Sequence, residues 1–127
     1  MPDSTKELAA RRMNFQGYGL GFNVHDHRGR KIVTHTGGWP GFVSKLTLVP
    51  EAGLGIAVLT NQESGEAFNA LTWAIVDHYL QAADTDGESA YAAVKARRDT
   101  SNAGAVQKAQ ASRAAGSTPS LPLERYA

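Results

Sequence analysis

Four short runs between Gly17 and Thr60 constrain the fold of this chain most, because each alternates apolar side chains with small or polar ones. A period of two residues is typical of a β-strand with one buried face. The runs are joined by segments rich in glycine, proline and aspartate, which favour tight turns. The spacing therefore predicts an antiparallel β-meander of about four strands. The predicted strands cover residues 17–24, 31–36, 42–49 and 54–60.

A helix is predicted directly after the meander. Apolar side chains recur at helical spacing across residues 65–81, and Ser64 is a suitable N-cap. So much apolar surface implies that the helix is buried against the sheet. The expected fold class is therefore α+β, an antiparallel meander with a packed C-terminal helix. The apolar helix positions are Phe68, Leu71, Trp73, Ile75, Val76, Tyr79 and Leu80.

Glycines mark two further segments. Gly17, Gly19 and Gly21 alternate with larger residues, so they should lie on one face of the first strand and allow another element to pack closely there. They do not form a nucleotide-binding loop, because no helix follows them. The run Gly37-Gly38-Trp39-Pro40-Gly41 is predicted to be a tight loop outside regular structure.

Composition narrows the function classes. The chain has 127 residues, 42% of them hydrophobic and 20% charged, which indicates a globular core. A net charge of +1 excludes a strongly polybasic nucleic-acid binder, so no nucleic-acid partner is expected. The chain has no cysteine, which excludes disulfides, cysteine-ligated metals and thiol nucleophiles. No apolar run is long enough to span a membrane, and residues 1–15 do not resemble a signal peptide. The sequence therefore does not determine the cellular compartment.

Charge and composition divide the chain. Residues 1–89 contain seven Lys/Arg and ten Asp/Glu, whereas residues 90–127 contain six and two. We expect an N-terminal helix or linker over 1–14, a compact unit over 15–82 and an alanine-rich basic helix and linker over 83–120. A solvated helix is the expected form of residues 90–115; contact with an anionic surface is the alternative.

Two histidines raise the question of a metal site. His25 and His27 are two residues apart and would share one face of a strand, as metal-binding pairs do. A third ligand is not evident, because His35 falls on the partner strand and His78 on the later helix. We therefore expect a solvated histidine pair at the edge of a turn, with no metal and no cofactor.

The segment of the sequence most suited to take part in catalysis is His35-Thr36-Gly37-Gly38. A strand end rich in glycine exposes backbone N–H groups that can stabilise a developing oxyanion, and a neighbouring side chain can orient a proton transfer. A glycine-rich hairpin with a structural histidine explains the same residues equally well on local grounds.

Several motifs in fixed order add a family resemblance over about residues 15–82. They are Tyr18-Gly19-Leu20-Gly21-Phe22, His35-Thr36-Gly37-Gly38-Trp39-Pro40-Gly41-Phe42, Val49-Pro50-Glu51 and Val58-Leu59-Thr60-Asn61. This segment resembles the C-terminal part of the serine beta-lactamase and penicillin-binding-protein-like hydrolases, in particular the class C-like esterase and D-aminopeptidase branch. Residues 121–127 resemble the opening of the small β-rich domain that often follows in such proteins.

The resemblance implies roles for five residues. His35 stands at the Lys/His position of the family's third motif, where the side chain polarises substrate and supports proton shuttling, and Thr36 would offer a hydroxyl to substrate. Gly37 would leave room for substrate along the strand, the N–H of Gly38 would be one oxyanion donor, and Trp39 would complete the substrate-binding stretch. Histidine in place of lysine favours an esterase- or peptidase-like hydrolase over a specialist for beta-lactams.

The family's other two motifs are missing. No serine is followed three residues later by lysine, and no tyrosine is followed two residues later by asparagine. Without a nucleophile and base the chain cannot perform covalent acyl transfer. We therefore expect a C-terminal fragment of a serine hydrolase, inactive alone, whose complete form cleaves a small ester, amide or lactam through a serine acyl-enzyme. Self-association, or pairing with the missing N-terminal part, is expected. The alternative is a non-catalytic β module that binds a peptide or protein through its sheet edge and the Trp39 segment.

Overall fold

The computed structural model describes residues 6–82, 86–113, 116 and 118–126. Parts of the expected N-terminal segment 1–14, of the segment 83–120 and of the segment 121–127 therefore lie outside the described residues. The chain divides into two units, Met1–Ala96 and Arg97–Ala127. The predicted strands and the predicted helix all belong to the first unit.

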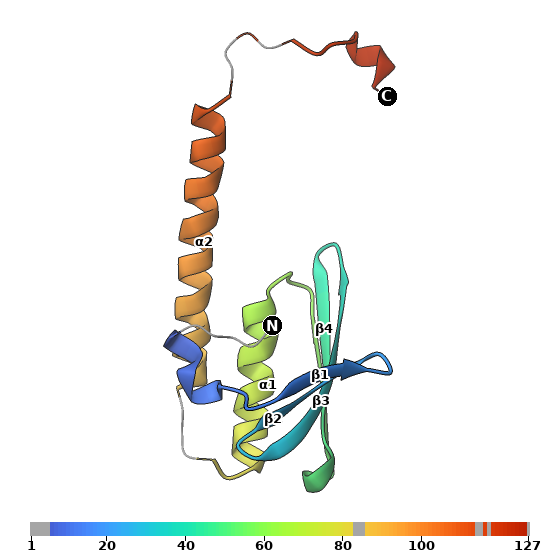
Figure 1. Ribbon diagram of the computed structural model, residues 1–127, viewed down its shortest axis with the longest axis vertical. Coiled ribbons are helices and arrows are strands. Elements are labelled where there is room, and N and C mark those ends of the chain that lie inside the picture. Colours follow the sequence, from blue (N-terminus) through green and yellow to red (C-terminus); the bar gives the residue numbers. More distant parts are fainter. Residues whose placement is uncertain (1–5, 83–85, 114–115, 117, 127) are drawn as a thin grey trace. The chain divides into compact units, whose positions relative to one another are not determined.

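The first unit contains one antiparallel sheet of five strands, in which every strand pairs with its neighbour in the chain (Figure 1). The strands are β1 (Gln16–Gly19), β2 (Phe22–His27), β3 (Arg30–Trp39), β4 (Phe42–Val49) and β5 (Leu54–Thr60). Short 3₁₀ turns stand before the sheet and between β4 and β5, as η1 (Lys6–Arg11) and η2 (Pro50–Ala52). The α+β meander is confirmed, with one strand more than expected.

The additional strand arises at a turn that the alternating pattern concealed. Leu20 and Gly21 both have positive φ, 52° and 83°, and they reverse the chain between β1 and β2. Positive φ at two central residues is typical of the tight hairpin turn that suits the twist of paired strands. The expectation of one continuous strand over 17–24 is therefore wrong.

No described residue packs closely against the glycine face, which is exposed. A Cβ atom added at Gly17 or Gly19 would meet nothing within 4 Å. All four residues of β1 are exposed. Only Gly21 needs to be glycine for its backbone conformation, because its φ is one that side chains with a Cβ rarely adopt.

The predicted helix is α1 (Gly65–Tyr79), and the Ser64 side chain accepts a hydrogen bond from the N–H of Ala67 as its N-cap. Figure 1 shows α1 along one face of the sheet. That face contains Val49 of β4 and Ile56 and Val58 of β5, all buried. The core is completed by Leu8, Ile32, Phe68, Trp73, Val76 and Tyr91.

The helix buries only part of its apolar surface. Phe68, Trp73 and Val76 are buried, as predicted. Leu71, Ile75 and Tyr79 remain 49%, 36% and 64% exposed, which corrects the expectation that they pack against the sheet. These three residues, four apart, form a continuous stripe along one side of α1. We call them the α1 stripe.

The second unit has an excess of basic over acidic residues, with five Lys/Arg and two Asp/Glu. The helix α2 (Gly87–Ala111) crosses the boundary between the units, and the short turn η3 (Leu123–Arg125) follows within the second. From residue 97 onward the described side chains are exposed. None of the helices in the described part of the chain is long and apolar enough to cross a membrane.

Candidate functional site

The predicted site residues lie at the free end of β3, but successive side chains point to opposite faces of the sheet. His35 pairs with Leu46 and Gly37 with Ser44, whereas Thr36 pairs with Lys45. Lys45 is buried and its Nζ donates a hydrogen bond to Asn69 of α1. Thr36 therefore belongs to the face that α1 covers, and His35 and Gly37 belong to the face opposite α1.

His35 lines a hollow on the face opposite α1. The hollow has a volume of about 460 Å³, and most of its wall is apolar. The His35 ring is exposed and meets the ring of Phe22 edge to face, with 6.1 Å between their centres. The other lining residues are Gly21, Gly37, Ser44, Lys45, Leu46, Ala57, Val58 and Leu59.

Gly37 has a steric reason to be glycine. A Cβ added at Gly37 would lie 2.8 Å from Oγ of Ser44, closer than real Cβ contacts come. The missing side chain keeps this part of the strand open, since Gly37 lines both the His35 hollow and a second one beside it. That Gly37 leaves room for a substrate along the strand stays a prediction.

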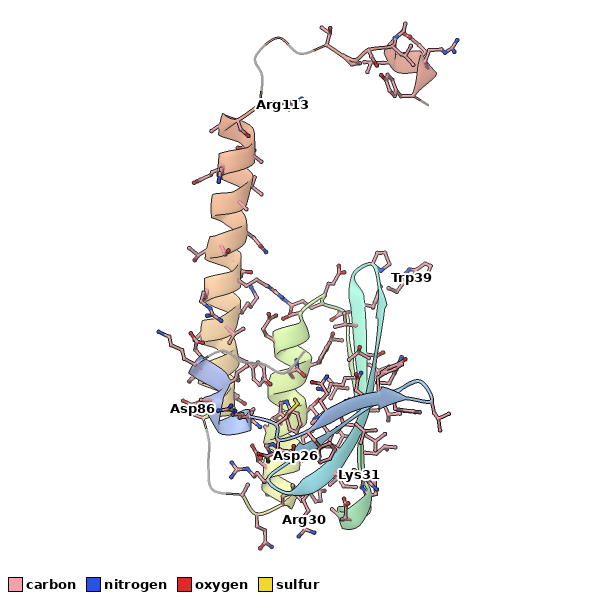
Figure 2. The ribbon with its side chains drawn as sticks, viewed as in Figure 1. Asp26, Arg30, Lys31, Trp39, Asp86 and Arg113 are labelled. Atoms are coloured by element: carbon pink, nitrogen blue, oxygen red, sulfur yellow. The ribbon has the colours of Figure 1, made fainter. Side chains whose placement is uncertain are left out.

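Gly38 and Trp39 line the second hollow, of about 620 Å³, near the end of the β3–β4 hairpin. Both belong to β3, so the expectation of an irregular loop is wrong for residues 37–39; the turn falls at Pro40 and Gly41. Figure 2 shows Trp39 at the tip of the hairpin, at the other end from Arg30 and Lys31. Its side chain is 76% exposed.

One edge of this strand end is free among the described residues. The pairing of β2 with β3 ends at Asn23 opposite Thr34, so no described strand pairs with residues 35–39 on the β2 side. Backbone N–H and C=O groups of an unpaired strand edge are available to a ligand. The free edge thus coincides with the predicted His35–Trp39 site.

Thr36 lines a different, more polar cavity of about 260 Å³ between the sheet and α1. Lys45 and Asn69 line it as well, and the Lys45 ammonium lies 5.6 Å and 5.3 Å from the ring centres of Phe68 and Trp73. Sequence reasoning missed Lys45. The available signal is a lone lysine at a position of alternation otherwise occupied by Val43, Thr47 and Val49, three residues of the face toward α1.

The histidine pair is buried, so the expected solvated pair is wrong. His25 and His27 are 5% and 3% exposed, and both rings contact Trp73. Burial, reinforced by the charge of Lys45, lowers the pKa of His25 to about 4. His25 is therefore neutral at neutral pH, and its Nε2 has no hydrogen-bond partner among the described residues.

Asp77 of α1 organises an ionic cluster next to this pair. Its Oδ1 lies 2.7 Å from Nε2 of His27 and 3.3 Å from Nε of Arg28, and its Oδ2 lies 3.0 Å from Nη2 of Arg11. Burial works to raise the pKa of Asp77, but the hydrogen bond from His27 and the arginine charges outweigh it, and the pKa is lowered. The cluster links η1, the β2–β3 turn and α1.

Asp26 fixes the segment that enters the sheet. Its carboxylate accepts hydrogen bonds from the N–H of Phe15 at 3.0 Å and from the N–H and side-chain amide of Asn14, both at 2.6 Å. These bonds, that from Phe15 foremost, lower the pKa of Asp26. The carboxylates of Asp26 and Asp77 are thus both used in hydrogen bonds or ion pairs, and the described residues include no group of three side chains suited to hold a metal.

The described residues alone do not assemble a nucleophile and base. Ser44 lines the same hollow as His35, but the hydrogen bonds of the described residues include none between the two side chains. An activated serine needs such a contact with its base.

Comparison with protein families identifies the family of this chain. Residues 8–81 match the family described as Beta-lactamase, and this match covers more than half of the chain. The chain belongs to the beta-lactamase family, which supports a serine-hydrolase type of relationship for the α+β unit. Comparison with curated proteins and with solved structures gave no significant match.

Proposed function

We propose that the chain supplies the third active-site motif of a serine acyl hydrolase of the class C-like esterase and D-aminopeptidase type. The observation that supports this most is the coincidence of the family match with the open end of β3. There His35 and Gly37 line an apolar hollow, and the strand edge next to them is free among the described residues.

In this proposal each residue contributes a separate function. His35 polarises the bound ester or amide and supports proton transfer at the leaving group, and the N–H of Gly38 donates to the developing oxyanion. Gly37 admits the substrate to the strand, and Trp39 covers the apolar part of it. Thr36 offers its hydroxyl from the other face, near the strand edge.

The nucleophile and its base must come from a segment outside this sequence, because the chain contains neither Ser-x-x-Lys nor Tyr-x-Asn. We propose that the chain corresponds to the C-terminal part of the catalytic domain and is inactive alone. A small ester, amide or lactam is the substrate of the completed site.

Complementation tests this function. The full chain is mixed with the N-terminal part of a beta-lactamase-family esterase cut before its own third motif, and serine labelling by a fluorophosphonate probe is measured together with hydrolysis of p-nitrophenyl esters and D-alanine p-nitroanilide. Neither part should react alone, and the mixture should do both. His35→Ala should abolish turnover, whereas His78→Ala, which removes an exposed histidine of α1, should not.

Two results would count against the proposal. One is hydrolysis by the chain alone that His35→Ala does not change. The other is an assembled complex, detected by co-purification, in which His35→Ala and His78→Ala behave alike.

The free edge of β3 and the exposed Trp39 also favour the alternative of a peptide-binding module. An extended peptide could add to this edge as a further strand, with Trp39 as an apolar contact. In that case Trp39→Ala would weaken binding of a peptide selected from a random library. The complementation assay would show no turnover, with wild-type chain or with His35→Ala.

A further inference from the structure

The first residue of β2, Phe22, lies across from His35 of β3. The register of the two strands pairs Asn23 with Thr34, and the next positions in the same register are Phe22 and His35. Residues directly opposite each other in an antiparallel pair have their side chains on the same face of the sheet. Phe22 and His35 therefore share the face opposite α1, just beyond the last pair of the β2–β3 ladder.

The rings of these two residues are in contact. Their centres are 6.1 Å apart and their planes are inclined at 72°, which is an edge-to-face arrangement. Favourable aromatic pairs have this geometry, with centres roughly 4.5–7 Å apart. Phe22 is half-buried, His35 is exposed, and both line the hollow of about 460 Å³. The Phe22 ring is thus a wall of this hollow that touches the imidazole.

No polar partner among the described residues fixes the imidazole of His35. Their hydrogen bonds and ion pairs include none that involves its ring. His27 is different, since its Nε2 lies 2.7 Å from the Asp77 carboxylate. In functional histidines a hydrogen bond to one ring nitrogen usually sets the orientation of the ring. Such a bond occupies a nitrogen, whereas contact with a phenyl ring, which has no polar donor or acceptor, leaves both nitrogens to the substrate.

We propose that Phe22 is a positioning residue for His35, whose imidazole it holds in one orientation by contact between the rings. An edge-to-face pair favours the oriented ring by a factor of about 2 to 12. Orientation matters because a proton transfer needs the ring nitrogen within hydrogen-bond reach of the reacting group. The inference rests on the proposed function for its effect on turnover, and the contact itself is testable on the chain alone.

The pair stands where the edge of β3 becomes free. The described strands pair with the β2 side of β3 as far as Thr34, and His35 is the first residue beyond the ladder. A substrate bound along residues 35–39 thus lies next to an imidazole that the Phe22 ring has already oriented. Such orientation removes the cost of fixing a freely rotating side chain in each turnover, so it acts on kcat rather than on KM.

Nuclear magnetic resonance of the full chain tests the orientation without catalysis. In the wild type, the ring protons of His35 should show a ring-current shift from Phe22, and the Hα–Hβ couplings of His35 should report one dominant χ1 rotamer. Phe22→Leu keeps an apolar side chain but removes the ring, so the shift should be lost and the couplings should average. Phe22→Tyr retains the ring and should retain both signals. His78, which meets the ring of Tyr79, is the internal control and should be unchanged in every variant.

Kinetics of the completed site test the consequence for turnover. In the complementation mixture, Phe22→Leu should lower kcat about 2- to 12-fold with little change in KM, and Phe22→Tyr should restore kcat. Phe15→Leu is the matched control, because it makes the same substitution at an exposed phenylalanine that lines neither hollow. It should leave kcat unchanged, and circular dichroism should show all variants folded.

Three results would overturn the inference. They are His35 signals that do not change in folded Phe22→Leu, a kcat that Phe22→Leu and Phe15→Leu lower equally, and a raised KM with unchanged kcat. The last result would make Phe22 a substrate contact only. If the wild-type mixture has no turnover, the proposed function fails, and the resonance signals of His35 in Phe22→Leu alone decide whether Phe22 orients the imidazole.

Discussion

His27 and Asp77 are fifty residues apart in the sequence, yet Nε2 of His27 donates a hydrogen bond of 2.7 Å to Oδ1 of Asp77. An ionised carboxylate only accepts, so the direction of this bond is defined. The same carboxylate binds Arg11 and Arg28. One side chain of α1 thus holds both the segment before the sheet and the β2–β3 turn.

Replacing Asp77 should therefore destabilise the first unit strongly. Asp77→Asn leaves the Arg11 side chain, only 7% exposed, without its carboxylate. Removing one partner of a buried ion pair costs about 3–5 kcal/mol, because the remaining charge stays desolvated. Urea unfolding followed by tryptophan fluorescence should show a loss in that range. Glu63→Gln, at an exposed residue before α1, should change the free energy of unfolding by less than about 0.5 kcal/mol.

Stability should fall as the pH decreases from about 6.5 to 4. The pKa of His25 is about 4 in the folded chain and near 6.5 in the unfolded chain, so between these values the unfolded state binds more protons. The stabilisation is complete above pH 6.5 and is lost as the pH falls toward 4, by up to about 3 kcal/mol. The pKa of His27 is lowered by burial as well and acts in the same direction.

His25→Phe measures the contribution of His25. The variant cannot take up a proton, so its free energy of unfolding should decline less between pH 6.5 and 4 than that of the wild type. His78→Gln, at an exposed histidine of α1, should keep the wild-type profile. Parallel profiles for His25→Phe and wild type would show that His25 does not titrate below its ordinary range.

Gly37→Ala should be tolerated better when Ser44 loses its hydroxyl. The new Cβ would lie 2.8 Å from Oγ of Ser44, so the hydroxyl has to turn away, which costs up to about 1 kcal/mol. Ser44→Ala removes the clashing atom, so the double variant should recover most of that loss in a double-mutant cycle. Gly55→Ala is the control, because its Cβ would lie at an ordinary 3.5 Å from Leu48.

The β1–β2 turn offers a stabilising substitution. Leu20 has a φ of 52° and a fully exposed side chain, so the strained backbone is not compensated by burial. Leu20→Asn creates the Asn-Gly pair that such turns prefer, and the free energy of unfolding should rise by about 0.5–1 kcal/mol. Arg28→Asn changes the equivalent position of the β2–β3 turn but loses the ion pair with Asp77, so it should give no net gain.

The alternation of apolar residues predicted the meander and the helix because burial on one face imposes a period on the sequence. The same alternation gave a wrong prediction at Leu20, because the residues of a hairpin turn continue the pattern between Gly19 and Gly21. One strand was predicted there, and the structure has two, β1 and β2. At Gly37 and Gly38 the glycines suggested a loop, but pairing with Ser44 and Val43 holds them in a strand. The low strand propensity of glycine is outweighed there by the backbone pairing of β3 with β4 along the whole hairpin.

The strand that carries the candidate site could be predicted from the sequence, but the faces on which its residues lie could not. The family resemblance proposes His35–Trp39 as the site, and the structure places these residues at the free end of β3. Thr36 lies on the face toward α1, and His35 lies on the opposite face. Which face the helix covers is decided by packing between distant segments, so the sequence near these two residues does not predict it. The burial of Lys45, His25 and Asp77 depends on contacts between distant segments, and their sequence surroundings look like those of solvated residues.

The position of Asp77 in the sequence also determines when, during synthesis, α1 can pack on the sheet and form its ion pairs. Each strand pairs with the one made just before it, so the meander can form step by step as the chain emerges. Arg11, His27 and Arg28 are synthesised early, and their carboxylate partner, Asp77, follows only with the last turns of α1. Until then the two arginines remain hydrated cations at the end of a sheet that α1 does not yet cover, so the ionic cluster forms in a single late event.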